Sequence, residues 1–162
     1  MAFKFSDVET ADLEAVHALN QSEVPHVGSV DIDRMRWFAD HADYFQVARL
    51  DGELAGFFVG LLPGSAYDSL NYRWFCDHFD NFAYCDRLAV AEIARRRGLA
   101  TQLYDDFTAA VRGRAHRITC EVNLQPPNPD SMNFHQRIGF VQVGTQSNAT
   151  GNKAVAFLEK KI

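Results

Sequence analysis

A basic turn at residues 95–98 carries the chemistry that is easiest to predict from this sequence. Three consecutive arginines precede Gly98, and apolar residues at four-residue spacing begin with Leu99, which is typical of a helix. The first N–H groups of a helix have no intrahelical partners, and the helix dipole favours negative charge there. Small residues at Gly98 and Ala100 would let a phosphate approach the backbone. We therefore expect an anion-binding site at this turn.

The residues before the turn alternate in the manner of a strand. Phe82, Tyr84, Asp86, Leu88 and Val90 would lie on one face, and the residues between them on the other. Asp86 is thus a carboxylate on a mostly apolar face. The predicted strand ends at Val90, a few residues before the predicted anion site.

The spacing of small and basic residues distinguishes between families of phosphate-binding turn. The P-loop requires a Lys-Ser/Thr pair and the dinucleotide fingerprint a third small residue, and the stretch around Gly98 has neither. The order Arg95-x-x-Gly98-x-Ala100, after a strand that ends in Leu88-Ala89-Val90, instead resembles the pyrophosphate turn of the GNAT N-acetyltransferases. The family pattern there is Arg/Gln-x-x-Gly-x-Gly/Ala after Leu-x-Val.

A second segment, residues 128–140, resembles the C-terminal motif of the same family. That motif is Asn-x-x-Ala/Ser-x-x-Phe-Tyr-x-x-x-Gly-Phe, and the matching residues are Asn128, Ser131, Phe134, Gly139 and Phe140. His135 stands where the family usually has a tyrosine. Residues 67–79 and 122–129 also look like a bacterial subgroup of the family, and they indicate no particular acceptor.

The resemblance implies a fold and an activity for the chain. The fold would be an α/β (α+β) GNAT fold, a mixed and mostly antiparallel twisted sheet of about seven strands with helices on both faces, forming a single domain over residues 1–162. The activity would be transfer of an acetyl group from the cosubstrate acetyl-CoA to a primary amine of a small molecule. Two alternatives are acetylation of a peptide or protein N-terminus and a non-catalytic acyl-CoA sensor.

The resemblance also implies which residues bind the coenzyme and move protons. Backbone of the strand would hold the pantetheine arm, and an N–H near Val90 would face the thioester oxygen. The expected coenzyme-binding residues are Leu88, Ala89, Val90, Arg95, Arg96, Arg97, Gly98, Leu99, Ala100, Thr101, Asn128, Ser131 and Phe134. Asp86 is the candidate base and His135 the candidate acid. Alternatively, Asp86 forms an ion pair with a neighbour such as Arg117, and His135 lies on the helix surface or only binds coenzyme.

The acceptor is expected to bind near an aromatic stretch, residues 63–79. Its turn residues and aromatic side chains predict a loop that walls the acceptor pocket, or alternatively an aromatic cap on the core. The candidate acceptor-binding residues are Tyr67, Asp68, Tyr72 and Glu121, and Glu121 is also the second candidate base. Polar groups of this kind would favour a cationic amine.

Periodicity and turn residues predict the elements that position these groups. Asp51-Gly52 between two β-rich runs is a strong hairpin signal, and Asp31 is a good N-cap for the helix after it. We expect strands at Phe3–Phe5, Tyr44–Leu50, Glu53–Leu61, Arg117–Val122, Phe140–Val143 and Ala154–Leu158, helices at Asp12–Leu19, Ile32–Phe38 and Ser131–Ile138, and a proline-rich loop at Asn123–Pro129.

Composition narrows the range of partners. With 162 residues, 47% of them hydrophobic, the chain suits one globular domain, and a net charge of −5 disfavours a general nucleic-acid or anionic-membrane binder. No run approaches the roughly 20 apolar residues of a membrane span. Cys76, Cys85 and Cys120 lack paired or metal-like spacing, which fits a reduced cytoplasm. We therefore expect a cytoplasmic enzyme with no nucleic-acid, membrane or metal partner, and leave a homodimer open.

Overall fold

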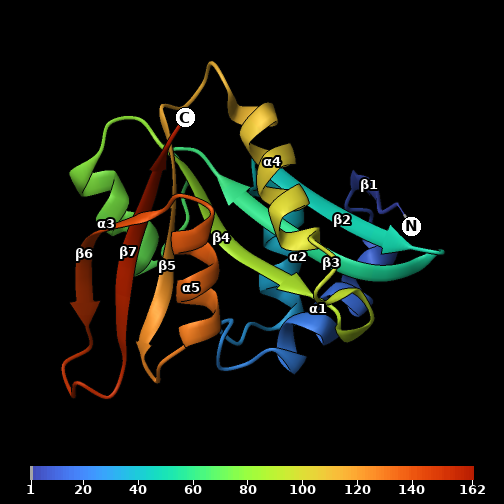
Figure 1. Ribbon diagram of the computed structural model, residues 1–162, viewed down its shortest axis with the longest axis horizontal. Helices are drawn as coiled ribbons and strands as arrows, with labels where there is room; N and C mark the ends of the chain where they lie inside the picture. The colour runs from blue at the N-terminus through green and yellow to red at the C-terminus, as the bar shows by residue number, and fades with distance from the viewer. Residues whose placement is uncertain (1) are drawn as a thin grey trace. The chain divides into compact units, whose positions relative to one another are not determined.

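The computed structural model describes residues 2–162 (Figure 1). Within these residues seven strands form one sheet in the order β1-β2-β3-β4-β5-β7-β6. The strands are β1 (Lys4–Asp7), β2 (Tyr44–Leu50), β3 (Glu53–Leu61), β4 (Ala83–Val90), β5 (Arg117–Gln125), β6 (Val141–Ser147) and β7 (Ala154–Lys161). The helices are α1 (Leu13–Ser22), α2 (Ile32–His41), α3 (Leu70–His78), α4 (Leu99–Val111) and α5 (Pro129–Arg137), with short 3₁₀ turns η1 (Thr10–Asp12) and η2 (Glu92–Ala94). The predicted α/β class with about seven strands is confirmed.

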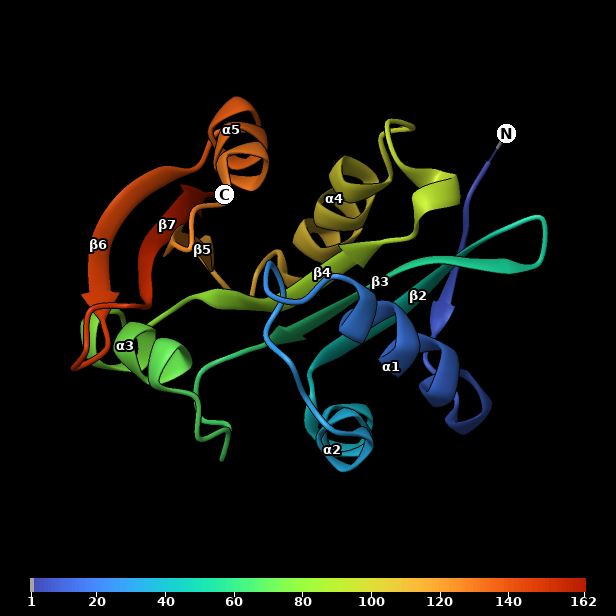
Figure 2. The ribbon, with the colours of Figure 1, turned by 90° about the horizontal axis from the view of Figure 1, so that it is seen from below.

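The chain divides into two compact units. The first runs to Leu61 and resumes at Cys85–Ala110. In it β1, β2 and β3 form an antiparallel meander, and β4 follows β3 in the sheet. Figure 2 shows α4 on one face of β3 and β4, and α1 and α2 on the other. The predicted hairpin is confirmed, because Asp51 and Gly52 both have positive φ, 52° and 83°, as a tight turn between β2 and β3 requires.

Local sequence explains how the helices of the first unit begin and pack. The Asp31 side chain accepts a hydrogen bond from the Arg34 N–H at 2.8 Å, so the predicted N-cap of α2 is confirmed. On α4, Leu99, Leu103 and Phe107 recur every fourth residue, and each is at most 1% exposed. They form the core between α4 and the sheet.

The second unit comprises Leu62–Tyr84 and Val111–Ile162. Its β5 runs parallel to the start of β4 and antiparallel to β7, which also pairs with β6. Trp74 of α3 stacks on Phe157 of β7, whereas Gly139, just after α5, faces Lys160. Since Phe157 and Lys160 point to opposite faces of β7, the two helices cover opposite faces of this part of the sheet.

Two segments differ from their predicted structure. The aromatic stretch does not remain a loop, because α3 begins at Leu70 once the Ser69 hydroxyl accepts the Tyr72 N–H at 3.3 Å. Aromatic residues favour strands in isolation, but here Tyr72 and Phe75 are buried on one side of a helix. The predicted loop at residues 123–129 is also shorter, because β5 continues to Gln125 and pairs with β7 up to that residue.

Candidate active site

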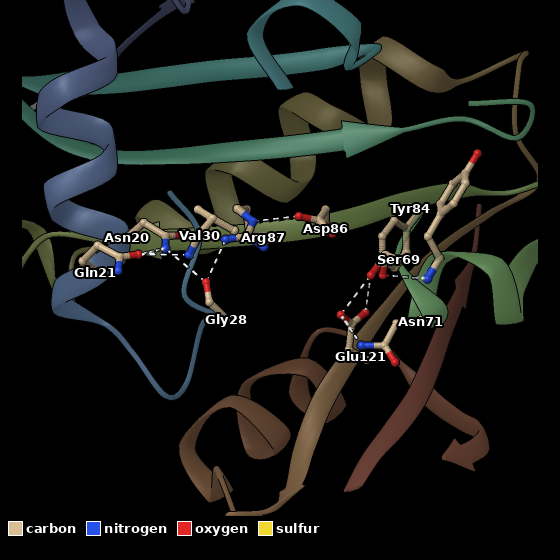
Figure 3. A network of polar contacts seen from close by, with 11 residues as sticks. Asn20, Gln21, Gly28, Val30, Ser69, Asn71, Tyr84, Asp86, Arg87 and Glu121 are labelled. Atoms are coloured by element: carbon tan, nitrogen blue, oxygen red, sulfur yellow. Dashed lines mark hydrogen bonds and ion pairs between the residues drawn. The ribbon is translucent and has the colours of Figure 1, made fainter. Parts of the chain in front are cut away.

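Strand β4 carries the candidate base Asp86 (Figure 3) and the predicted pantetheine-binding residues Leu88, Ala89 and Val90. Its register with β5 covers Ala83 and Tyr84, which pair with Ile118 and Thr119. Further along, in the first unit, Asp86 is half-buried as a residue while its side chain is only 3% exposed. The exposed surface at Asp86 is therefore mainly backbone. Backbone that is accessible on a strand of this kind can form hydrogen bonds to an extended ligand.

The basic turn after β4 has the backbone conformation that an anion site requires. Arg96 and Gly98 have positive φ, 62° and 78°, and α4 begins at the next residue. A Cβ placed on Gly98 would meet nothing within 4 Å, and the first turn of α4 has no acidic residue. Gln102 donates to the Gly98 carbonyl at 3.1 Å, so the N–H groups of the residues between them form the open end of the helix. The turn therefore fits a phosphate-bearing ligand.

Gly56 of β3 is a residue whose importance the sequence did not reveal. A Cβ on Gly56 would lie 2.8 Å from the Ala89 carbonyl oxygen and 3.0 Å from Cδ2 of Leu99. Only glycine therefore allows β3 to approach the end of β4 and the start of α4 this closely. Gly56 thus positions both of the segments that are predicted to bind coenzyme.

Asp86 is paired, but not with the predicted neighbour. Nε of Arg87 donates to Asp86 Oδ2 at 2.7 Å, and both side chains are at least nine-tenths buried. Arg117, the predicted alternative partner, instead pairs with Glu159 at 2.7 Å and lies over the Phe79 ring. Asp86 is therefore paired with Arg87, and the predicted pair with Arg117 is not formed.

His135 is buried within the second unit. Its Nδ1 lies 2.7 Å from the carbonyl oxygen of Ser131, and because a carbonyl only accepts, Nδ1 carries the proton in this contact. The rings of Phe134 and Phe140 meet it edge-on. Burial lowers the pKa of His135 below its usual value, against a smaller opposing effect of the Ser131 hydrogen bond. The neutral imidazole is therefore favoured, with Nε2 as an acceptor.

Glu121 of β5 is the centre of a polar cluster in the second unit (Figure 3). The Tyr84 hydroxyl lies 2.7 Å from Oε2 and 2.9 Å from Oε1, and Asn71 Nδ2 donates to Oε1 at 3.2 Å. Glu121 is half-buried, whereas Tyr84 is fully buried. Tyr84 and Asn71 thus hold the Glu121 carboxyl group in place.

Comparison with known proteins agrees with the geometry of β4, the turn and α4. The description "Acetyltransferase (GNAT) family" belongs to the family model that matches residues 13–140. The chain belongs to this family. It is therefore an acyltransferase of the N-acetyltransferase type, in a family whose acetyl donor is acetyl-CoA. No curated protein matches the sequence.

Solved structures share the GNAT fold over nearly the whole chain. Ard1 from Thermoplasma volcanium is 19% identical, with a TM-score of 0.80 over 100% of this chain and 99% of its own. NAA60 from Arabidopsis thaliana, in complex with acetyl-CoA, is 19% identical, with a TM-score of 0.76 over 99% of this chain and 100% of its own. The ribosomal-protein-S18-alanine N-acetyltransferase from Escherichia coli is 15% identical, with a TM-score of 0.71 over 99% and 94%.

The structure places the remaining predicted residues of this GNAT chain in different roles. The Tyr72 hydroxyl donates to the Leu62 carbonyl at 2.7 Å, so this group holds the segment before α3. Tyr67 is buried against Tyr72, and Asp68 is exposed. Asn128 caps α5 by accepting from the Ser131 N–H at 3.3 Å. Tyr67 and Tyr72 thus follow the alternative prediction for the aromatic stretch, a cap on the core.

Several residues of the polar networks were not predicted from the sequence. Asn20, Gln21 and Arg87 carry no motif, and they have hydrogen-bond partners 8, 9 and 67 positions away, respectively. Within residues 2–162, no group of three or more His, Cys, Asp or Glu side chains could hold a metal ion. None of the helices in that range is long and apolar enough to cross a membrane.

Proposed function

We propose that this GNAT enzyme transfers the acetyl group of acetyl-CoA to a primary amine of a small molecule, and that residues 1–162 form one catalytic domain. The observation that carries the proposal is the half-buried Glu121 carboxylate, which Tyr84 and Asn71 hold in place. A carboxylate that is fixed in this way would attract a compact ammonium group.

The coenzyme would bind along the first unit. Backbone of Leu88, Ala89 and Val90 would hold the pantetheine arm, and the turn at residues 95–101 would hold the pyrophosphate. Supporting observations are the accessible backbone at Asp86, the positive φ of Gly98 and the open first turn of α4. Acetyl-CoA supplies an activated acetyl thioester when it is bound.

The amine must be neutral before it can attack, so a nearby carboxylate has to accept its proton. We propose Asp86 for this step and Glu121 as the second candidate, and each accepts a hydrogen bond that fixes it, from Arg87 and Tyr84 respectively. An N–H near Val90 would polarise the carbonyl. His135 as the acid remains a prediction, and its neutral, Ser131-bound ring favours the role of a hydrogen-bonding residue.

A peptide or protein N-terminus is the second candidate acceptor. It is favoured by one observation, the likeness to the E. coli enzyme whose name gives an alanine of ribosomal protein S18 as its acceptor. A terminal α-amine and a small primary amine would present the same charge to Glu121. They differ in the size of the group that carries the amine, so acceptor size separates them.

The test is a panel of acceptors at saturating acetyl-CoA. 1,5-Diaminopentane, tyramine, glycinamide and heptapeptides that begin with serine or alanine would be compared by their release of coenzyme A. We expect the highest kcat/KM with a small amine, and a large loss of activity for that amine in Glu121→Gln. Higher kcat/KM for both peptides would favour the alternative.

The enzyme is further expected to be cytoplasmic. Sedimentation would test whether it forms a homodimer.

A further inference from the structure

Arg87 is a buried cation of β4 whose role is not explained by acetyl transfer itself. Its guanidinium donates through Nε to Asp86 and through Nη1 to the Asn20 side chain and the Gly28 carbonyl, both at 2.9 Å (Figure 3). It also lies over the Phe38 ring of α2, 5.2 Å from its centre. One side chain thus joins β4 to α1, to α2 and to the chain between them.

The chain between these helices, residues 23–31, is here called the α1–α2 segment. It has little regular structure, and side chains of α1 hold it. Asn20 Nδ2 donates to the Gly28 carbonyl at 3.1 Å, Gln21 Oε1 accepts the Val30 N–H at 3.2 Å, and Gln21 Nε2 donates to the Ser29 hydroxyl at 2.9 Å. Arg87 adds a contact from the sheet to this set. The conformation of the segment therefore depends on a residue of β4.

The type of cation matters for these contacts. A lysine could balance the charge of Asp86, but its single ammonium group cannot reach a carboxylate, an amide oxygen and a carbonyl in three fixed directions at once. The planar fork of arginine can do so. Asn20 is fully buried, so its Oδ1 has to find a donor within the protein. The arrangement therefore specifies arginine at position 87.

The same segment also reaches the predicted coenzyme turn. The carboxylate of Glu23, at the start of the segment, forms an ion pair with Arg95. The segment thus contacts the basic turn through Glu23 and the Asp86–Arg87 pair through Gly28. A segment that is tied to both the candidate base and the coenzyme turn is well placed to border the acceptor.

We propose that Arg87 is a positioning residue, which fixes Asp86 and the α1–α2 segment in a single arrangement and thereby sets the affinity for the amine acceptor. This inference rests on the proposed function, in which Asp86 accepts a proton from the amine. Arg87 acts through these two groups and does not itself touch the amine.

Three variants test the inference. Arg87→Lys keeps a charge beside Asp86 but loses the fork. Gln21→Ala loosens the α1–α2 segment and leaves the Arg87–Asp86 pair intact. Arg49→Lys is the matched control, because Arg49 also forms an ion pair, with Asp12, in the same unit but does not contact the segment. Measurements are KM for the best amine of the acceptor panel, the Kd of acetyl-CoA, and amide hydrogen exchange of residues 24–31.

For Arg87→Lys we expect acceptor KM and amide exchange of the segment to rise about tenfold, as the loss of hydrogen bonds to a charged group predicts. The Kd of acetyl-CoA should not rise. Gln21→Ala should raise acceptor KM and exchange to a smaller extent with an unchanged kcat–pH profile, and Arg49→Lys should change neither. Unchanged exchange in Arg87→Lys, or equal increases in acceptor KM and acetyl-CoA Kd, would overturn the inference.

Failure of the proposed function gives a different result. If Asp86→Asn and Glu121→Gln keep the wild-type kcat, the proton-transfer proposal is wrong. Increased exchange together with raised acceptor KM in Arg87→Lys would still support positioning of the segment. The two proposals can therefore be judged separately.

Discussion

At the scale of single residues, the structure changes the expected effect of substituting the candidate bases. Asp86 is paired with a buried arginine, so Asp86→Asn leaves Arg87 without its counter-charge and should cost about 3 kcal/mol or more of stability. Glu121 accepts hydrogen bonds from Tyr84 and Asn71, and Glu121→Gln should leave the fold largely intact. We expect Glu121→Gln to lower kcat by roughly 10²-fold or more, with a smaller loss at high pH where free amine is already neutral.

The measurement is kcat against pH for both variants, with Asp80→Asn, an exposed carboxylate of the same unit as Glu121, as the control. A loss below tenfold with an unchanged pH profile would mean that Glu121 only binds its neighbours. Catalysis would then depend on proximity and on the backbone contact with the thioester oxygen.

His135 should make the stability of the protein sensitive to acid. Burial lowers its pKa in the folded state, so between that value and the ordinary value of 6.5 the unfolded chain binds more protons. The contribution of neutral His135 to stability is therefore present above pH 6.5 and is lost as pH falls through the folded-state pKa. In His135→Phe this part of the acid sensitivity should disappear.

Unfolding midpoints between pH 5 and 8 would measure this effect, with exposed His26→Gln as the control. If wild type and His135→Phe lose stability in parallel over this range, His135 is not the group responsible. The kcat of His135→Ala over the same range separately tests the predicted acid.

At the scale of elements, the sequence predicted the helices and strands that are specified by residues close together in the chain. Asp51-Gly52 with alternating strands fixed the β2–β3 hairpin, and the four-residue spacing from Leu99 fixed α4, because each pattern depends only on neighbouring residues. The start of α3 was missed because Tyr72 and Phe75 become helical through burial in the core. The partner of Asp86 was also missed, since a side-chain contact is decided by packing that no motif encodes.

The turn before α4 allows a controlled test of the coenzyme site. Gly98 and Gly113 have φ of 78° and 87°, and a Cβ at either position would meet nothing within 4 Å. Asparagine tolerates this conformation better than other residues with a side chain, so Gly98→Asn and Gly113→Asn should cost similar, small amounts of stability.

Only Gly98→Asn places a side chain where a phosphate would approach the turn. We expect it to raise the Kd of acetyl-CoA at least about tenfold, as the loss of one charge-assisted contact predicts, and Gly113→Asn to leave it unchanged. Calorimetric titration measures both. Equal affinities in the two variants would remove Gly98 from the coenzyme site.

At the scale of the whole molecule, the sequence allowed the fold to be predicted, but it did not identify the acceptor. Two motifs and the order of strands identified the GNAT fold, because a coenzyme that is bound by backbone at fixed spacing would leave a pattern in the sequence. The amine would contact Glu121, which Tyr84 and Asn71 hold in place, and these three side chains come from three separate elements. Their meeting depends on the folded chain, and spacing therefore could not reveal it.

Acetyl-CoA should stabilise the folded protein by mass action, since a ligand that binds only the native state adds about 2.7 kcal/mol at a hundred times its Kd. For a chain of this size that corresponds to a rise in Tm of several degrees, roughly 5 to 10 °C. ATP and NAD share phosphates with acetyl-CoA but lack the pantetheine arm that would pair with the backbone of Leu88 to Val90. They should therefore raise Tm much less at equal concentration.

Thermal unfolding with each ligand, with desulfo-CoA as a control for the thioester, would measure the contribution of the pantetheine arm. Equal shifts from acetyl-CoA, ATP and NAD would mean that the basic turn at residues 95–98 is a general anion site and that β4 takes no part in binding.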